Sequence, residues 1–319
     1  MITLYFDNSV LDPVAVQGVG GRVKSLLKRN GAVAFASIQN LIEFFRIDLD
    51  DEQRAQRIRT LLQVARVRER EPLLYQDIRA LIGQIRRHHP DWINDMPNLV
   101  RIRKELNDAK IVWERLKSDP EYRPPGFLRS RHWLWSVIGE SMNRHRRRGP
   151  TSVPGSALSA AFEDPQFDSR MRPLFEALPA VEGHWREHTG LAYWAALEVN
   201  DELGSNLKDW LGPHLHFERI GTEPWMRFWL SELDAAAVPR MRVEGMTDYF
   251  QEKVDSGNAG DIEHAGYAVG RDYLLTADKD LHRILTLVEH QSTMIARPKF
   301  MDRSAPDIVG AIASLLGWS

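Results

Sequence analysis

The fold class is decided by the stretch Asp261-Ile-Glu-His-Ala-Gly-Tyr-Ala268, together with Tyr273-Leu-Leu-Thr-Ala-Asp278 shortly after it. The first segment is typical of a helix that opens with a carboxylate, and the second of a short buried strand that ends in one. The N-terminus repeats the second arrangement, because Ile2-Thr-Leu-Tyr-Phe6 is an apolar run that stops at Asp7. Short apolar runs bounded by polar residues suit the buried strands of a parallel sheet. The sequence therefore predicts an α/β fold.

Carboxylates follow these apolar runs at the point where each strand ends. In open α/β sheets, ligands bind just outside the carboxyl ends of the strands, so Asp7 and Asp278 are expected at one crevice. Like charges held that close raise one another's pKa unless a cation neutralises them. The pattern therefore favours a site for a hard metal ion.

A further carboxylate comes from a third strand and its helix. The run Gly31–Ala36 is strand-like, and Ser37 stands where a helix N-cap belongs. Glu43 lies at the flank of the apolar stripe of this helix, which is formed by Ile38, Leu41, Ile42 and Phe45. Asp261 has the same relation to the apolar face of its own helix.

Taken together, these segments resemble the PIN domain, a family of metal-dependent nucleases that includes the toxin ribonucleases of prokaryotic toxin–antitoxin pairs. Four motifs follow the order of that family: Asp7 with Ser9, Ser37 with Glu43, Asp261 with Ala265 and Ala268, and Thr276 with Asp278 and Asp280. The resemblance covers residues 1–50 and 236–319, because a long segment, residues 51–235, separates the two parts. Leu281 replaces the aromatic residue often found after the last Asp of the family.

The resemblance implies a parallel sheet of four or five strands flanked by helices, and an endoribonuclease that uses Mg²⁺ or Mn²⁺. The expected catalytic acids are Asp7, Glu43, Asp261, Asp278 and Asp280. The first four of these would hold the metal, directly or through water, and Asp280 would support them from the edge. Ser9 and Thr276 would order ligands or water through their hydroxyl groups. His264 is expected to pack in the core, and no side-chain base is assigned.

Residues 51–235 are predicted to form a mostly α-helical insertion between the two halves of the core. Helical periodicity runs over Glu52–Arg70 and over 73–87, 98–117 and 128–142. The Gly/Pro/Ser-rich stretch at 149–155 predicts a boundary inside the insertion. The tryptophans of the second part are expected to pack between helices: Trp185, Trp194, Trp210, Trp225 and Trp229.

The net charge of −2 conceals an asymmetry. Residues 51–150 contain 22 Lys or Arg against 13 Asp or Glu, so this segment is basic and the rest of the chain is acidic. A basic part that holds the phosphate backbone suits a nuclease, whereas the alternative is an ordinary solvated helix face. The densest group is Arg144, Arg146, Arg147 and Arg148. Phosphate contact is preferred for it, because a helix C-terminus needs fewer cations.

One further pattern competes with the acidic site. His184-Trp-Arg-Glu187-His188 matches the HxxEH pattern of a metalloprotease family, in which two His residues one turn apart hold zinc and the Glu acts as a base. The sequence shows no downstream acidic helix of that family. A polar, exposed helical turn is therefore the preferred interpretation.

Composition limits the remaining choices. The chain has no cysteine, so disulfides and thiolate metal sites are excluded. No apolar run reaches the roughly 18–20 residues of a membrane helix, and Met1 leads straight into a strand, so a cytoplasmic protein without membrane contact is expected.

The sequence leaves several alternatives open. It does not separate RNA from DNA as substrate, one metal from two, or a monomer from a homodimer. It also allows a catalytically inactive PIN-like scaffold whose helical insertion binds an inhibitory or scaffold protein. The complete set of acids argues against that alternative.

Overall fold

The structure, a computed structural model, describes residues 1–45, 49–67, 73–124, 165–198, 209–251 and 256–318. It divides into two compact units. The first comprises Met1–Arg70, Asn107–Trp133 and Glu263–Ser319, and the second comprises Glu71–Leu106 and Leu134–Ile262. The predicted sub-boundary at 149–155, the helix predicted over 128–142 and the Arg144–Arg148 cluster lie outside the described residues.

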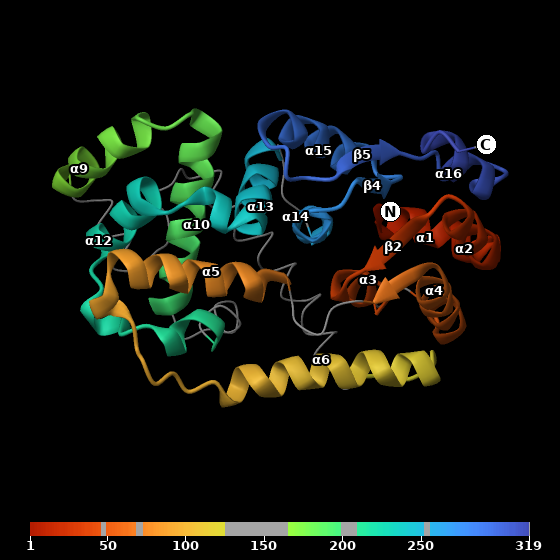
Figure 1. The fold of residues 1–319 in the computed structure, drawn as a ribbon, viewed down its shortest axis with the longest axis horizontal. Coiled ribbons are helices and arrows are strands. Elements are labelled where there is room, and N and C mark those ends of the chain that lie inside the picture. The colour runs from red at the N-terminus through yellow and green to blue at the C-terminus, as the bar shows by residue number, and fades with distance from the viewer. Residues whose placement is uncertain (46–48, 68–72, 125–164, 199–208, 252–255, 319) are drawn as a thin grey trace. The chain divides into compact units, whose positions relative to one another are not determined.

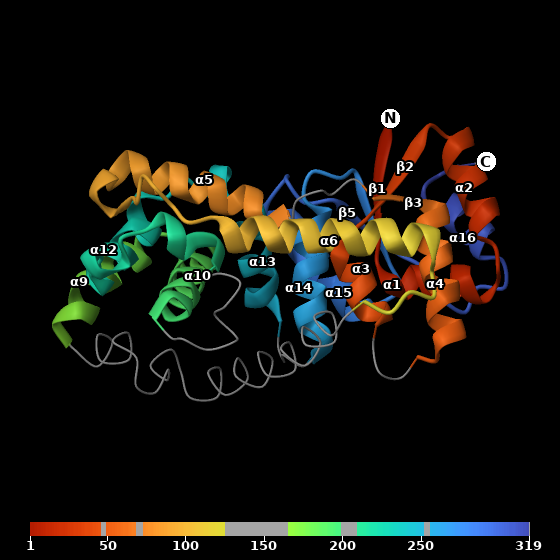
Figure 2. The ribbon, with the colours of Figure 1, turned by 90° about the horizontal axis from the view of Figure 1, so that it is seen from below.

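The described part of the first unit carries a five-stranded parallel sheet in the order β3-β2-β1-β4-β5. Its strands, which can be followed in Figures 1 and 2, are β1 (Ile2–Phe6), β2 (Ala32–Ala36), β3 (Ala65–Val67), β4 (Tyr273–Thr276) and β5 (Arg297–Phe300). The α/β class and the parallel sheet are therefore confirmed.

The sheet extends beyond residue 50, where the first half of the predicted core ends. The helix predicted over Glu52–Arg70 is wrong at its C-terminal end, because α4 (Asp51–Val64) is followed directly by β3. Ala65 to Val67 pair with Ala34 to Ala36 of β2, so pairing at the sheet edge overrides the helical periodicity. At the other boundary, α13 (Pro239–Phe250) belongs to the second unit although it lies within 236–319.

β1 is the central strand, paired with β2 on one side and with β4 on the other. Side chains alternate across a strand, so Tyr5 points to the opposite face from Leu4 and Phe6, and all three are fully or almost fully buried. The helices of this unit include α1 (Asn8–Val16), α2 (Gly20–Arg29), α3 (Ile38–Phe44), α15 (Lys279–Gln291) and α16 (Ile308–Leu315). α1 and α2 pack on α4, whereas α15 packs on β4 and β5.

Two helices contain residues of both units, because the chain passes from one unit to the other within them. These are α6 (Val100–Ser118) and α14 (Ser256–Ala268). No helix in the described ranges combines the length and the apolar character that crossing a bilayer requires.

The described part of the second unit is helical. Its longer helices are α5 (Leu73–His88), α9 (Pro165–Glu176), α10 (Ala180–Glu198) and α13, and α12 (Thr222–Arg227) continues into a π-helical turn over Phe228–Glu232. Short 3₁₀ turns occur at Pro90–Trp92, Gly212–His214, Phe217–Arg219 and Ala235–Ala237. All five tryptophans expected to pack are buried, and three of them have no exposed surface: Trp185, Trp225 and Trp229.

Glycine permits close packing around these tryptophans. A Cβ atom on Gly190 of α10 would lie 2.8 Å from Cγ of Trp229, which is closer than side chains approach in folded proteins. Gly83 lies in the middle of α5 on its exposed side, and a Cβ atom built on it would have open space around it.

Gly190→Ala should therefore lower the free energy of unfolding by about 1–3 kcal/mol, because overpacking forces the neighbouring ring to move. Gly83→Ala is the matched control and should raise it by about 0.5–1 kcal/mol, because alanine restricts the unfolded chain more than glycine does. Urea unfolding of both variants measures the difference. Equal effects of the two substitutions would contradict this packing arrangement.

Candidate metal centre

Asp7 follows β1 directly and occupies the N-cap position of α1. Its side chain is buried, and two hydroxyl groups donate to its Oδ2: Ser9 Oγ, and Thr276 Oγ1 at 2.8 Å. Ser9 Oγ in turn accepts the backbone N–H of Ala277 at 2.7 Å. The two hydroxyl groups predicted to order the site thus hold this carboxylate, one from α1 and one from the end of β4.

Glu43 reaches the same place from α3. Oε1 accepts a hydrogen bond from Gln39 Nε2 at 2.8 Å, and Oε2 accepts one from Asn8 Nδ2 at 2.7 Å. The side chain of Glu43 is 20% exposed, whereas that of Asp7 is 7% exposed. Of the two carboxylates, Glu43 is therefore the more accessible to solvent.

His264 of α14 lies between the two carboxylates. Its Nε2 is 2.9 Å from Glu43 Oε1 and 3.4 Å from Asp7 Oδ1. On the other side of the ring, Nδ1 is 2.6 Å from the hydroxyl of Tyr5, which is 2.7 Å from Ser37 Oγ. Both ring nitrogens thus have polar neighbours, and the orientation of the imidazole is fixed. The expectation that His264 packs is correct for burial but misses these polar contacts.

A pair of asparagines supports Glu43 and the start of its helix. Asn40 donates to the Phe6 carbonyl at 3.0 Å and to Asn8 Oδ1 at 2.9 Å, while Asn8 donates to the Asn40 carbonyl at 3.0 Å. Asn40 also completes a capping box with Ser37, which begins α3 as predicted. The carboxyl ends of β1 and β2 are therefore joined by side-chain amides immediately beneath the acids.

The pKa values of the two acids are shifted in opposite directions. Burial raises the pKa of Asp7, an effect that the charge of His264 opposes and the charge of Glu43 reinforces. Burial also disfavours ionisation of Glu43, but His264 and the amides of Gln39 and Asn8 outweigh it, so the pKa of Glu43 lies below its usual value. The folded structure therefore favours the ionised form of Glu43. Ionisation of Asp7, by contrast, costs free energy unless a further cation is present.

Asp278 lies at the N-cap of α15, where its Oδ1 accepts the backbone N–H groups of Asp280 and Leu281 at 2.8 and 2.9 Å. Its own N–H donates to Thr276 Oγ1 at 3.0 Å, the hydroxyl that also binds Asp7. Asp278 and Asp280 are both exposed, and neither joins the close group of Asp7, Glu43 and His264. The N-cap role that competes with metal binding is therefore present at Asp278.

Asp261 is half-buried and lies one helical turn before His264 on α14. The division of the chain assigns Asp261 to the second unit and His264 to the first. The close group of ligand atoms, all within 4.8 Å of one another, therefore comes wholly from the first unit and contains two of the four predicted metal ligands, together with one histidine.

The position of this group in the sheet is informative. The strand order reverses at β1, because β2 and β3 lie on one side of it and β4 and β5 on the other. Asp7 follows β1, and Thr276 ends β4, so the group lies at the carboxyl ends of the strands where the order reverses. Ligands of open α/β sheets bind at such topological switch points.

Sequence reasoning missed the histidine and the amides of this group. Its only signal for His264 was the spacing of three from Asp261, which places both on neighbouring turns of one helix face. Asn8 stood beside Asp7, and Asn40 stood three residues after the N-cap, where a capping-box partner is expected.

Comparison of the chain with protein-family models, with curated proteins and with solved structures found no match.

The raised pKa of Asp7 has a consequence for stability. A carboxyl group whose pKa is higher in the folded state loses its stabilising effect as the pH rises through that pKa. In the absence of divalent ions, Asp7→Asn should therefore be as stable as the wild type or more stable at neutral pH, and the gain should vanish in acid. Urea unfolding between acid and neutral pH, with a chelator present, measures this difference.

Asp272 provides a control of opposite sign. The backbone N–H and hydroxyl of Thr3 donate to its Oδ2 at 2.7 and 2.8 Å and lower the pKa of this exposed acid. Asp272→Asn should thus lose stability at neutral pH and match the wild type only in acid. If the two variants respond to pH in the same direction, the electrostatic description of Asp7 is wrong.

Proposed function

We propose that this chain is a divalent-metal-dependent nuclease that hydrolyses phosphodiester bonds, with RNA as its substrate. The observation that supports the proposal best is the meeting of Asp7, Glu43 and His264 at the carboxyl ends of the central strands. The ordered acidic motifs of the sequence provide the link to PIN-type nucleases. In the proposed site, Asp278 joins the metal-binding set, directly or through water, and Asp280 supports it from the edge; Asp261 remains an expectation from the sequence alone.

The donor atoms fit a divalent cation. Two carboxylates offer the oxygen ligands that Mg²⁺ and Mn²⁺ prefer, and the imidazole of His264 adds a ligand better suited to a transition metal. The raised pKa of Asp7 is the second indication, because a buried carboxylate with an acidic neighbour needs positive charge to stay ionised. Mn²⁺ should support activity better than Mg²⁺ if the imidazole binds the ion.

When bound, a divalent cation lowers the pKa of a coordinated water and stabilises charge on phosphate oxygens. The protein would contribute orientation. Asn8 and Gln39 hold the two oxygens of Glu43, while Ser9 and Thr276 hold Oδ2 of Asp7 and leave Oδ1 directed at His264. Tyr5 fixes the imidazole through Nδ1, so Nε2 faces both acids.

A second candidate function is favoured by the same histidine. Nε2 of His264 lies within 3.4 Å of both carboxylates, so a protonated imidazole could neutralise them without a metal. In that case the unit would be an inactive scaffold, and the second unit would bind a protein partner. Divalent-ion-dependent cleavage by the purified chain decides between the two candidates.

The direct test compares wild type with Asp7→Asn and Glu43→Gln on labelled single-stranded RNA and DNA, with Mn²⁺, with Mg²⁺ and with a chelator. Both substitutions should reduce metal-dependent cleavage by at least about 100-fold, since loss of a supporting residue alone typically costs metal affinity or activity 10–100-fold. Asp95→Asn is the matched control, because the Asp95 side chain is 90% exposed and belongs to the second unit.

Several outcomes would correct the proposal. Cleavage by either acid variant at the wild-type rate would exclude that acid from catalysis. Cleavage of DNA in preference to RNA would change the substrate class and leave the metal site in place. If the wild type shows no metal-dependent cleavage, the result supports the alternative of an inactive scaffold.

The basic segment supplies a second test. If Arg144, Arg146, Arg147 and Arg148 contact phosphates, their joint replacement by Gln should weaken RNA binding for all sequences alike. Each lost contact should reduce the slope of log affinity against log salt by about 0.7 for a single strand. Titration of the quadruple variant at several salt concentrations measures the slope, and an unchanged slope would exclude phosphate binding by this cluster.

A further inference from the structure

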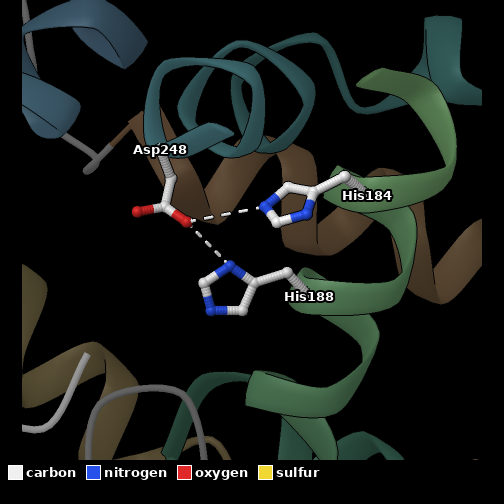
Figure 3. A group of neighbouring side chains, drawn as sticks. All are labelled: His184, His188 and Asp248. Carbon is white, nitrogen blue, oxygen red and sulfur yellow. Dashed lines mark ion pairs between the residues drawn. The ribbon is translucent and has the colours of Figure 1, made fainter. Parts of the chain in front are cut away.

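A second group of potential metal ligands lies wholly within the second unit. Its members are His184 and His188 of α10 and Asp248 of α13, and their ligand atoms lie within 4.8 Å of one another. Figure 3 shows both imidazole rings directed from α10 towards the carboxylate on the neighbouring helix. The group corresponds to the HxxEH pattern, for which an exposed helical turn is the preferred interpretation of the sequence. Asp248 adds an acid from a separate helix, which the local sequence pattern does not contain.

The two histidines have the spacing of a helical chelate. Residues four apart lie one turn apart on the same helix face, so both rings can approach one ion. The His184 side chain is 38% exposed and that of His188 is 39% exposed. Both side chains are therefore partly exposed to solvent, although Nε2 of His184 itself is buried.

Asp248 supplies the buried side of the group, because its side chain is only 6% exposed. One oxygen, Oδ2, serves both histidines: it lies 2.8 Å from His188 Nδ1 and 4.0 Å from His184 Nε2. Two ligands held about 2.1 Å from one zinc ion lie no more than about 4.2 Å apart. Both separations are compatible with a shared ion.

Nε2 of His184 is buried without a hydrogen bond to any described residue that would compensate for its burial. In the part of the chain that the structure describes, this nitrogen is buried and has no hydrogen-bond partner, and 4.0 Å from Asp248 is too long for a hydrogen bond. A buried polar atom without a partner costs free energy. An ion between the three side chains would give it one.

The helices are held close where the group forms. A Cβ atom on Gly245, one turn before Asp248, would lie 2.6 Å from Cβ of Trp185, the neighbour of His184. Glycine at this position thus allows α13 to approach α10. The N-terminus of α13 is fixed independently, since Asp77 accepts the backbone N–H groups of Arg240 and Met241 at 2.7 and 3.0 Å. The three ligands are therefore presented by a rigid helix pair.

We propose that His184, His188 and Asp248 bind a zinc ion that ties α10 to α13. Two imidazoles and a carboxylate match the nitrogen and oxygen ligands of zinc sites, and the absence of cysteine from the chain leaves no thiolate alternative. A hard ion such as Mg²⁺ prefers oxygen ligands and is disfavoured by this donor set. Three protein ligands leave one coordination position open to water or to a further ligand.

The test uses the full chain, freed of metal, and zinc titrated against a chromophoric chelator. Because zinc could also enter the centre of Asp7, Glu43 and His264, the titration is run in the Asp7→Asn background as well as in the wild type. His184→Ala and Asp248→Asn should each weaken binding of one zinc equivalent by at least about 100-fold in both backgrounds. His290→Ala, at an exposed histidine of α15, is the matched control and should leave that equivalent unchanged.

Two readouts keep the result independent of misfolding. The melting temperature of the Asp7→Asn protein should rise with zinc, because an ion that binds only the folded state stabilises it, and this rise should disappear with His184→Ala. Co²⁺ in the Asp7→Asn protein should give the strong visible absorption of a four- or five-coordinate ion. If Co²⁺ shows only weak six-coordinate bands, or if His184→Ala leaves zinc affinity and the melting shift unaltered, the group is an ordinary ion pair of His188 with Asp248 and the proposal is wrong.

Discussion

The candidate metal centre of the first unit is built around a buried carboxyl group at the end of the central strand. Asp7 follows β1 in the middle of the sheet, and its carboxylate is almost completely removed from water. Taking an ion out of water is expensive unless hydrogen bonds and opposite charge replace the hydration. The partners that replace it come from separate parts of the chain, since Ser9 lies on α1, Thr276 on β4 and His264 on α14. The site therefore forms only when both ends of the chain have joined the sheet.

The cost of burying a charge also explains why the pKa values of Glu43 and Asp7 are shifted in opposite directions. Glu43 lies near the edge of the group and receives two amide donors and the imidazole, so its anionic form is favoured. Asp7 receives hydroxyl donors and a more distant imidazole nitrogen, and its anionic form is disfavoured. An additional positive charge would favour ionisation of Asp7. This imbalance is the physical basis for proposing a cation there.

The sequence predicted those features that depend on neighbours along the chain. Apolar runs ending in acids located β1 and β4, and the N-cap signal at Ser37 located α3 and with it Glu43. Features that depend on distant partners were missed: His264 meets Glu43 across 221 residues, and Asp248 meets the histidine pair from a different helix. β3 was missed for the same reason, because three residues adopt strand structure only where β2 offers an edge. Asp278 illustrates a limit of local patterns, because an acid after a strand predicts a helix N-cap and a metal ligand equally well. The structure shows the N-cap.

We propose that a divalent cation binds between Asp7 and Glu43. Crystals of the full chain grown with Mn²⁺, with anomalous diffraction recorded at the manganese absorption edge, test it most directly. We expect an anomalous peak within bonding distance of carboxylate oxygens of Asp7 and Glu43, with the ring of His264 either bound to the ion or displaced from Glu43. The contradicting result is a site without manganese in which Nε2 of His264 still lies between the two carboxylates, because the imidazole would then be the only cation that the site requires.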